Sequence, residues 1–171
     1  MALDTDVPCT GAEKYGMYHG RPCVILKMNN IYGWEPRPYY NLTQINNIVG
    51  MPTWLKTTIT NHYNKHCLPL PKKARKKCPQ MRMIWLSCEG ETAADEEHMG
   101  KVHYVPWQGF PGYYYPYLNQ QHYLSPIVFI QFRNITPGVL IQVRCKIWAR
   151  NIQHDPTNPR KGGIHFEILM D

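Results

Sequence analysis

The sequence contains none of the motifs that mark common catalytic and nucleotide-binding sites. Its 171 residues include no P-loop, no G-x-S-x-G nucleophile turn, no H-E-x-x-H zinc motif and no G-x-G-x-x-G dinucleotide fingerprint. No nucleophile can be paired with a base, and no set of side chains has the usual spacing of metal ligands. We therefore expect no catalytic residue, no metal and no cofactor, and the sequence favours a non-catalytic protein.

Closely spaced cysteine pairs are missing as well. The six cysteines form an even set without a C-x-x-C pair, which disfavours a structural zinc site and favours disulfides. Spacing alone leaves their connectivity open. The candidate disulfide residues are Cys9, Cys23, Cys67, Cys78, Cys88 and Cys145.

Two N-glycosylation sequons accompany these cysteines. They begin at Asn41 and Asn134, and Pro137 directly after the second is expected to lower its use. Disulfides and N-glycans both form along the secretory route, so the two signals together favour an extracellular protein.

Neither a membrane span nor an export signal is present in the sequence. No segment approaches about 18 consecutive apolar residues, the length that a spanning helix needs. Residues 1–8 have neither a basic region nor an apolar stretch, so they do not form a signal peptide. We expect a fragment of a longer extracellular protein, and a truncated variant that stays in the cytosol is the alternative.

Turn-forming residues and short alternating segments indicate a mainly β protein. The chain has 15 prolines and 12 glycines, and its apolar residues alternate with polar ones in several short runs. Such alternation buries one face of a strand and leaves the other solvated, as in antiparallel sheets packed on a core. We predict a single domain over residues 1–171, an antiparallel β-sandwich with a short helix or irregular segment within 44–65. The predicted strands cover residues 23–28, 82–88, 101–107, 127–133, 139–149 and 164–170.

Cys88 and Cys145 both fall on the apolar faces of their predicted strands. We therefore predict a disulfide between them that joins the two sheets; a pair of buried thiols is the alternative. Closing a loop of this length, about sixty residues, would contribute roughly 4 kcal/mol in the chain-entropy model. Cys9 and Cys23 flank a loop rich in glycine and tyrosine and would close it locally.

The formal net charge of +7 has one concentrated source, a basic run between Cys67 and Cys78. A nuclear localisation signal or a phosphate-binding patch is one interpretation of such a run. We favour a solvated loop tied by those two cysteines, because no basic stripe interleaved with aromatics accompanies the run, and we expect no nucleic-acid partner. The run consists of Lys72, Lys73, Arg75, Lys76 and Lys77.

Two other groups of polar residues have weaker functional interpretations. His62, His66, Cys67 and Cys78 can be drawn as a zinc set, but cysteines eleven positions apart do not resemble a zinc knuckle. Residues 95–98 place three carboxylates beside a histidine, which acid/base chemistry or a cation site would use. Solvated charges ahead of a strand are the simpler explanation.

An aromatic run is the most unusual feature of the chain. Tyrosine has a large apolar face and a polar tip, which suits protein–protein interfaces. A proline in the run removes a backbone donor and favours an exposed edge or loop over a central strand. Packing of some of these rings in the core is the alternative. The predicted partner-binding residues are Tyr113, Tyr114, Tyr115, Pro116 and Tyr117.

Several of these segments together resemble the beta subunits of sodium/potassium-transporting ATPases, in an invertebrate version. The first half of the family's small disulfide loop is similar to Cys9-Thr10-Gly11. The other matching segments are 20–29 (GRPCVILKMN), 109–117 (GFPGYYYPY), 123–126 (YLSP), 131–136 (QFRNIT) and 143–146 (VRCK).

The resemblance implies an immunoglobulin-like β-sandwich with Cys9–Cys23 and Cys88–Cys145 as family disulfides and a glycan at Asn134. It implies a non-catalytic subunit at the plasma membrane that helps the alpha subunit of the P-type pump to fold, delivers it to the cell surface and tunes its cation affinity. The tyrosine run resembles the segment that contacts an extracellular loop of alpha. ATP hydrolysis and ion binding belong to alpha.

The sequence departs from the family pattern in three places. The family's cytoplasmic tail, membrane helix and stalk have no counterpart here, which puts membrane anchoring of this chain in doubt. Pro8 replaces an asparagine that often carries a glycan. The basic run and the pair Cys67 and Cys78 are additional, and we expect a local third disulfide there. A free adhesion or secreted binding module with the same fold is the alternative function.

Overall fold

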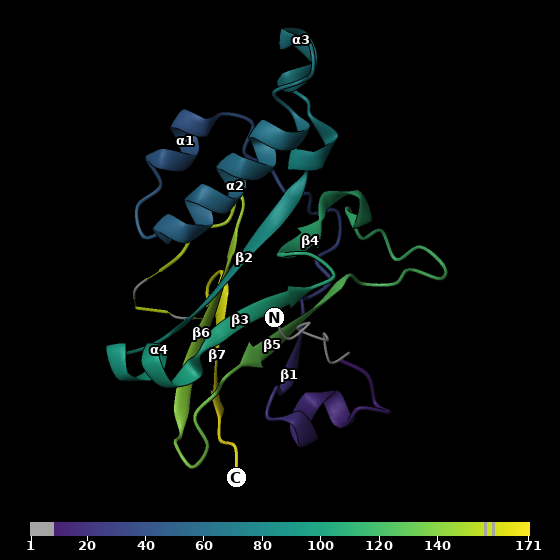
Figure 1. Ribbon diagram of the computed structural model, residues 1–171. Coiled ribbons are helices and arrows are strands. Elements are labelled where there is room, and N and C mark those ends of the chain that lie inside the picture. The colour runs from purple at the N-terminus through teal and green to yellow at the C-terminus, as the bar shows by residue number, and fades with distance from the viewer. Residues whose placement is uncertain (1–8, 156, 159) are drawn as a thin grey trace.

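The computed structural model describes residues 9–155, 157–158 and 160–171. The expectations for residues 1–8, including the one for Pro8, lie outside this part of the chain. Within it, two antiparallel sheets pack face to face (Figure 1). The predicted mainly β sandwich is confirmed.

The two sheets contain three and four strands. The three-stranded sheet has the order β1-β5-β3, and the four-stranded sheet has the order β4-β2-β6-β7. The bounds of the first sheet are β1 Cys23–Lys27, β5 Ile127–Arg133 and β3 Lys101–Val105. Those of the second are β4 Gly109–Pro111, β2 Met83–Gly90, β6 Ile141–Trp148 and β7 Gly163–Ile168.

The main core lies between the sheets and follows the alternation seen in the sequence. From β2 it receives Ile84, Leu86 and Cys88, which alternate along the predicted strand 82–88. The facing strand β5 contributes Val128, Ile130 and Phe132, all fully buried. Strand β6 adds Ile141, Val143 and Cys145 to the same core.

Helices and helical turns occupy the connections. The α-helices are α1 Leu42–Asn46, α2 Thr53–His66, α3 Lys72–Arg75 and α4 Ala93–Met99. The 3-10 turns are η1 Lys14–His19, η2 Pro79–Met81 and η3 Gly112–Tyr114. Residues 44–65, predicted as a short helix or irregular segment, thus form part of α1 and most of the 14-residue α2.

A second core lies on the outer face of the four-stranded sheet. There Trp85 and Trp148 pack against Leu55 and Ile59, which are one turn apart on α2. The Trp148 indole N–H donates to the Ser87 hydroxyl at 2.8 Å, which satisfies two buried polar groups. The prediction that the outward faces of these strands are solvated is therefore wrong for β2, because α1 and α2 cover that face (Figure 1).

The Cys88–Cys145 disulfide lies within one sheet. Strands β2 and β6 are hydrogen-bonded neighbours, and Cys88 is directly opposite Cys145 with their Cα atoms 4.0 Å apart. The prediction that this disulfide joins the two sheets is wrong. Alternation with period two shows which face of a strand is buried, but it does not show which strands share a sheet.

The other two disulfides close short loops. Cys9–Cys23 ties the segment containing η1 to the first residue of β1. Cys67–Cys78 joins the C-cap of α2 to the residue before η2, so the basic run is the interior of a closed loop. Cys67 and Cys78 are both fully buried in the core beneath the helices.

Candidate partner-binding surface

The aromatic run starts from an edge strand that is tightly fixed to the sheet. Strand β4 pairs with β2, placing Phe110 opposite Ile84, and the Phe110 ring enters the main core. Gly109 has φ +146°, and a side chain there would collide with the Ile84 carbonyl oxygen. The Gly112 N–H donates to the Arg82 carbonyl at 2.6 Å, so backbone pairing continues into η3.

Tyr115 lies in the core. Its side chain is only 9% exposed and meets Trp34 edge to face at 5.7 Å between ring centroids. Its hydroxyl lies 3.3 Å from the Met28 sulfur, and burial raises the pKa of Tyr115. Pro116 restricts the residue before it, and Tyr115 is accordingly extended. A docking protein cannot reach the Tyr115 ring, which instead fixes the segment to the core.

The neighbouring rings of the run lie at the surface. Tyr113 is 66% exposed, and its ring centroid lies 4.6 Å from that of the half-buried Tyr114. Tyr117 is also half-buried, and its ring lies 5.0 Å from that of Tyr123. The Tyr117 hydroxyl donates to Asn119 at 2.9 Å. These rings are therefore held in place while part of each still faces solvent.

A second segment, distant in sequence, joins this surface. Tyr32 forms a parallel bridge with Tyr117, and the Gly33 N–H donates to the Tyr117 carbonyl at 2.9 Å. The bridge leaves Tyr32 72% exposed. Nothing in the local sequence pairs Tyr32 with the run about eighty residues away, so the sequence analysis missed this residue as a candidate contact.

We call the combined region the aromatic surface. It comprises exposed or partly exposed apolar and tyrosine side chains from the two bridged segments. Its residues are Ile31, Tyr32, Tyr113, Tyr114, Pro116, Tyr117, Leu118 and Leu124. Exposed tyrosine and leucine side chains on two bridged segments are typical of a protein contact rather than of a solvated surface.

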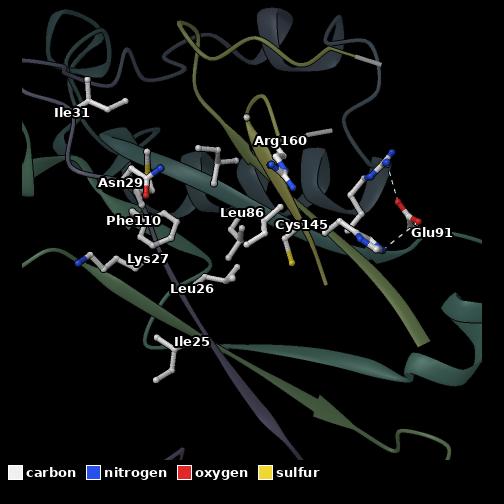
Figure 2. A pocket seen from close by; sticks show the side chains of 17 residues that line it. Ile25, Leu26, Lys27, Asn29, Ile31, Leu86, Glu91, Phe110, Cys145 and Arg160 are labelled. Atoms are coloured by element: carbon white, nitrogen blue, oxygen red, sulfur yellow. Dashed lines mark ion pairs between the residues drawn. The ribbon is translucent and has the colours of Figure 1, made fainter. Parts of the chain in front are cut away.

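A groove opens between the sheets on the side of β1 and β7 (Figure 2). Its volume is about 1020 Å³, and Leu26, Leu86 and Phe110 form part of its apolar lining. On its rim Glu91 binds Arg144 at 2.9 Å and His165 at 3.5 Å. These charges pair with one another rather than converging on the apolar lining.

The polar groups singled out in the sequence have structural roles. The Asp95 carboxylate caps α4 together with Thr92, so residues 95–98 form part of a capped helix that precedes β3. Bonds from Thr92 and from the Gln142 N–H lower the pKa of Asp95. Cys67 and Cys78 are bonded to each other, so neither is a free thiolate ligand. Among the described residues, no three His, Cys, Asp or Glu side chains gather as a metal site.

Both predicted glycosylation sites are exposed. Asn41 is the N-cap of α1, and its Oδ1 accepts from the Thr43 N–H at 2.9 Å. Asn134 follows directly after β5 in a left-handed conformation, with φ 63°. A sugar on the amide nitrogen of Asn41 would leave its capping oxygen in place.

Comparison with known proteins gives one consistent result. The family model described as "Sodium / potassium ATPase beta chain" matches residues 2–166. Subunit beta-2 of the sodium/potassium-transporting ATPase of Drosophila melanogaster is 43% identical over 171 residues, covering 99% of this chain and 48% of the relative. Subunit beta-1 of the same fly is 37% identical over 164 residues, covering 95% and 47%.

A vertebrate relative matches the same region. Subunit beta-1 of Tetronarce californica is 32% identical over 168 residues, covering 95% of this chain and 47% of the relative. The two fly proteins share more identity with the chain, in agreement with the invertebrate character of its motifs. The chain spans about half the length of the curated relatives it matches. No helix among the described residues is long and apolar enough to cross a membrane.

The contrast between Tyr115 and Tyr113 gives a stability prediction. Tyr115→Ala leaves a cavity in the main core, so we expect the free energy of unfolding to fall by about 3 kcal/mol or more. Tyr113→Ala removes an exposed ring, and we expect a change below about 0.5 kcal/mol. Urea unfolding followed by tryptophan fluorescence measures both. Equal effects of the two substitutions would show that Tyr115 is not a core residue.

Proposed function

Because the chain belongs to the sodium/potassium ATPase beta chain family, we propose that it is the extracellular domain of a beta subunit that binds the catalytic alpha subunit of a sodium/potassium-transporting P-type ATPase. The chain itself is non-catalytic. By binding alpha it assists the folding of that subunit and its delivery to the plasma membrane. It also tunes the affinity of alpha for cations.

The observation that carries this proposal is the aromatic surface. Tyrosine is enriched among the residues that dominate binding energy, because its ring buries a large area while few torsions are frozen. Here the backbone that carries the rings is fixed by the pairing of β4 with β2, by the burial of Tyr115 and by the Tyr32–Tyr117 bridge. Such support lowers the entropic cost of association, since little ordering remains to be done on binding.

An extracellular position fits the covalent chemistry of the chain. All six cysteines are in disulfides, a state that persists in oxidising compartments. We propose that the domain lies on the extracellular side of the plasma membrane, carrying N-glycans at Asn41 and Asn134. Both asparagines are exposed at the ends of secondary-structure elements, which leaves their side chains accessible to the glycosylation machinery.

Removing the two most exposed tyrosines of the aromatic surface tests the alpha interaction. The chain is directed to the secretory pathway with an affinity tag and co-expressed with a sodium/potassium ATPase alpha subunit. We expect Tyr32→Ala with Tyr113→Ala to lower the amount of alpha retained at least about tenfold, the loss typical of two central interface aromatics. Quantitative immunoblotting of the retained alpha measures the change.

Tyr18→Ala is the matched control, because Tyr18 is 81% exposed but belongs to η1, which lies at the bottom of Figure 1, whereas β4 and the aromatic run after it lie in the upper half. It should retain alpha as the unaltered chain does. Undiminished retention by the double variant would falsify the assignment of the interface to the aromatic surface. Failure of the unaltered chain to retain alpha would instead contradict the partner itself and favour a free adhesion module.

The glycans are tested in the same secreted material. We expect Asn41→Gln and Asn134→Gln each to abolish one glycosidase-sensitive mass step, with lower occupancy at Asn134 because Pro137 follows its sequon. Thr43→Ala also destroys the first sequon but retains the capping oxygen of Asn41. It should therefore lose the same mass step with a smaller loss of stability than Asn41→Gln, which also removes a cap worth about 1 kcal/mol. A chain whose mass is unchanged by glycosidase contradicts both sites.

A further inference from the structure

The positive charge of the protein comes from one continuous segment. Residues 36–88 contain nine Lys and Arg side chains and not one Asp or Glu. The rest of the chain has ten basic and twelve acidic residues, so it is slightly negative. This segment contains α1, α2, α3 and most of β2, which places the basic residues in the helical layer and at one end of the molecule (Figure 1).

The highest charge density is in the closed loop 67–78, which we call the basic finger. Its short helix α3 projects beyond the body of the protein, at the top of Figure 1. The Cys67–Cys78 disulfide closes its base, and the Arg75 Nε–H donates to the Leu70 carbonyl at 2.7 Å. Arg75 thus holds the shape of the loop and leaves its lysines directed to solvent.

Four lysines of the basic finger are exposed and have no acidic partner among the described residues: Lys72, Lys73, Lys76 and Lys77. Lys72 and Lys73 lie in α3, Lys76 is its C-cap and Lys77 follows in the turn, so four exposed positive charges are held within six residues. Like charges held this close repel one another. The arrangement therefore opposes local stability, and the repulsion would be relieved by an external ligand that carries several negative charges.

We propose that the basic finger binds a sulfated glycan chain. Such a polymer presents closely spaced anionic groups along its length. The ammonium group of lysine is a compact positive charge that attracts each of them. The disulfide at the base of the finger belongs to an oxidising compartment, where sulfated glycans rather than nucleic acids are the abundant polyanions. Anionic lipids concentrate in the cytoplasmic leaflet, so a lipid surface fits the extracellular position proposed above less well.

Binding to immobilised heparin tests this proposal with the full 171-residue chain. Replacing Lys72, Lys73, Lys76 and Lys77 together by Gln should weaken binding at least about tenfold and flatten its dependence on salt, since fewer counterions are released from the polymer. The matched control replaces four exposed lysines outside residues 36–88 by Gln: Lys14, Lys27, Lys101 and Lys161. The two variants have the same net charge, so only a local site distinguishes them.

Several results would overturn the proposal. An equal loss in both variants shows a response to net charge alone, and equal binding to N- and O-desulfated heparin shows that sulfate is not recognised. Stronger binding to phosphatidylserine vesicles than to heparin assigns the finger to a lipid surface. Circular dichroism establishes that each variant is folded.

The proposed heparin site and the proposed alpha interface can be tested independently of each other. The finger variant should retain the alpha subunit at the level of the unaltered chain, and Tyr32→Ala with Tyr113→Ala should bind heparin normally. A finger variant that loses both activities contradicts a separate glycan site. A chain that binds heparin but not alpha leaves the glycan site in place and contradicts the proposed pump partner.

Discussion

The pairing of β2 with β6 is the constraint on which the rest of the molecule depends. These two strands lie side by side in the four-stranded sheet and have a core on each face. Towards the other sheet they present Leu86 and Cys88, and towards the helices they present Trp85 and Trp148. The Cys88–Cys145 disulfide fixes the register of the pair. A shift of one residue would exchange the two faces and disrupt both cores at once.

Both proposed binding surfaces are attached to the same strand. On its edge away from β6, strand β2 pairs with β4, from which the aromatic surface continues through η3. The start of β2 follows directly on η2 and the buried Cys78, so the basic finger is anchored there through its disulfide. The protein thus holds an uncharged aromatic surface and a strongly basic projection on one rigid support. Their different chemistry suits different partners.

Local patterns in the sequence were sufficient for the strands and the fold class, because alternation directly reports the buried face of a strand. They were not sufficient where long-range packing decides the outcome. Trp85 and Trp148 fall on strand faces that the alternation assigns to solvent, and they are buried because helix α2 covers them. Cys88 and Cys145 are neighbours within a sheet, which no periodicity reveals. Tyr115 and Tyr113 look alike in the sequence, and only long-range contacts, including those with Trp34 and Met28, make the first a core residue. Tyr32 joins the aromatic surface through a single backbone bridge.

Native-state hydrogen exchange tests most directly whether the two cores depend on one strand pair. If they do, the slowest amides of α2, β2 and β6 exchange through the same opening, with a free energy equal to that of global unfolding. The helical layer then cannot detach while the sandwich stays folded. Exchange of the α2 amides through an opening about 2 kcal/mol or more below that of β2 would contradict the account, because the helices would then be an independent unit.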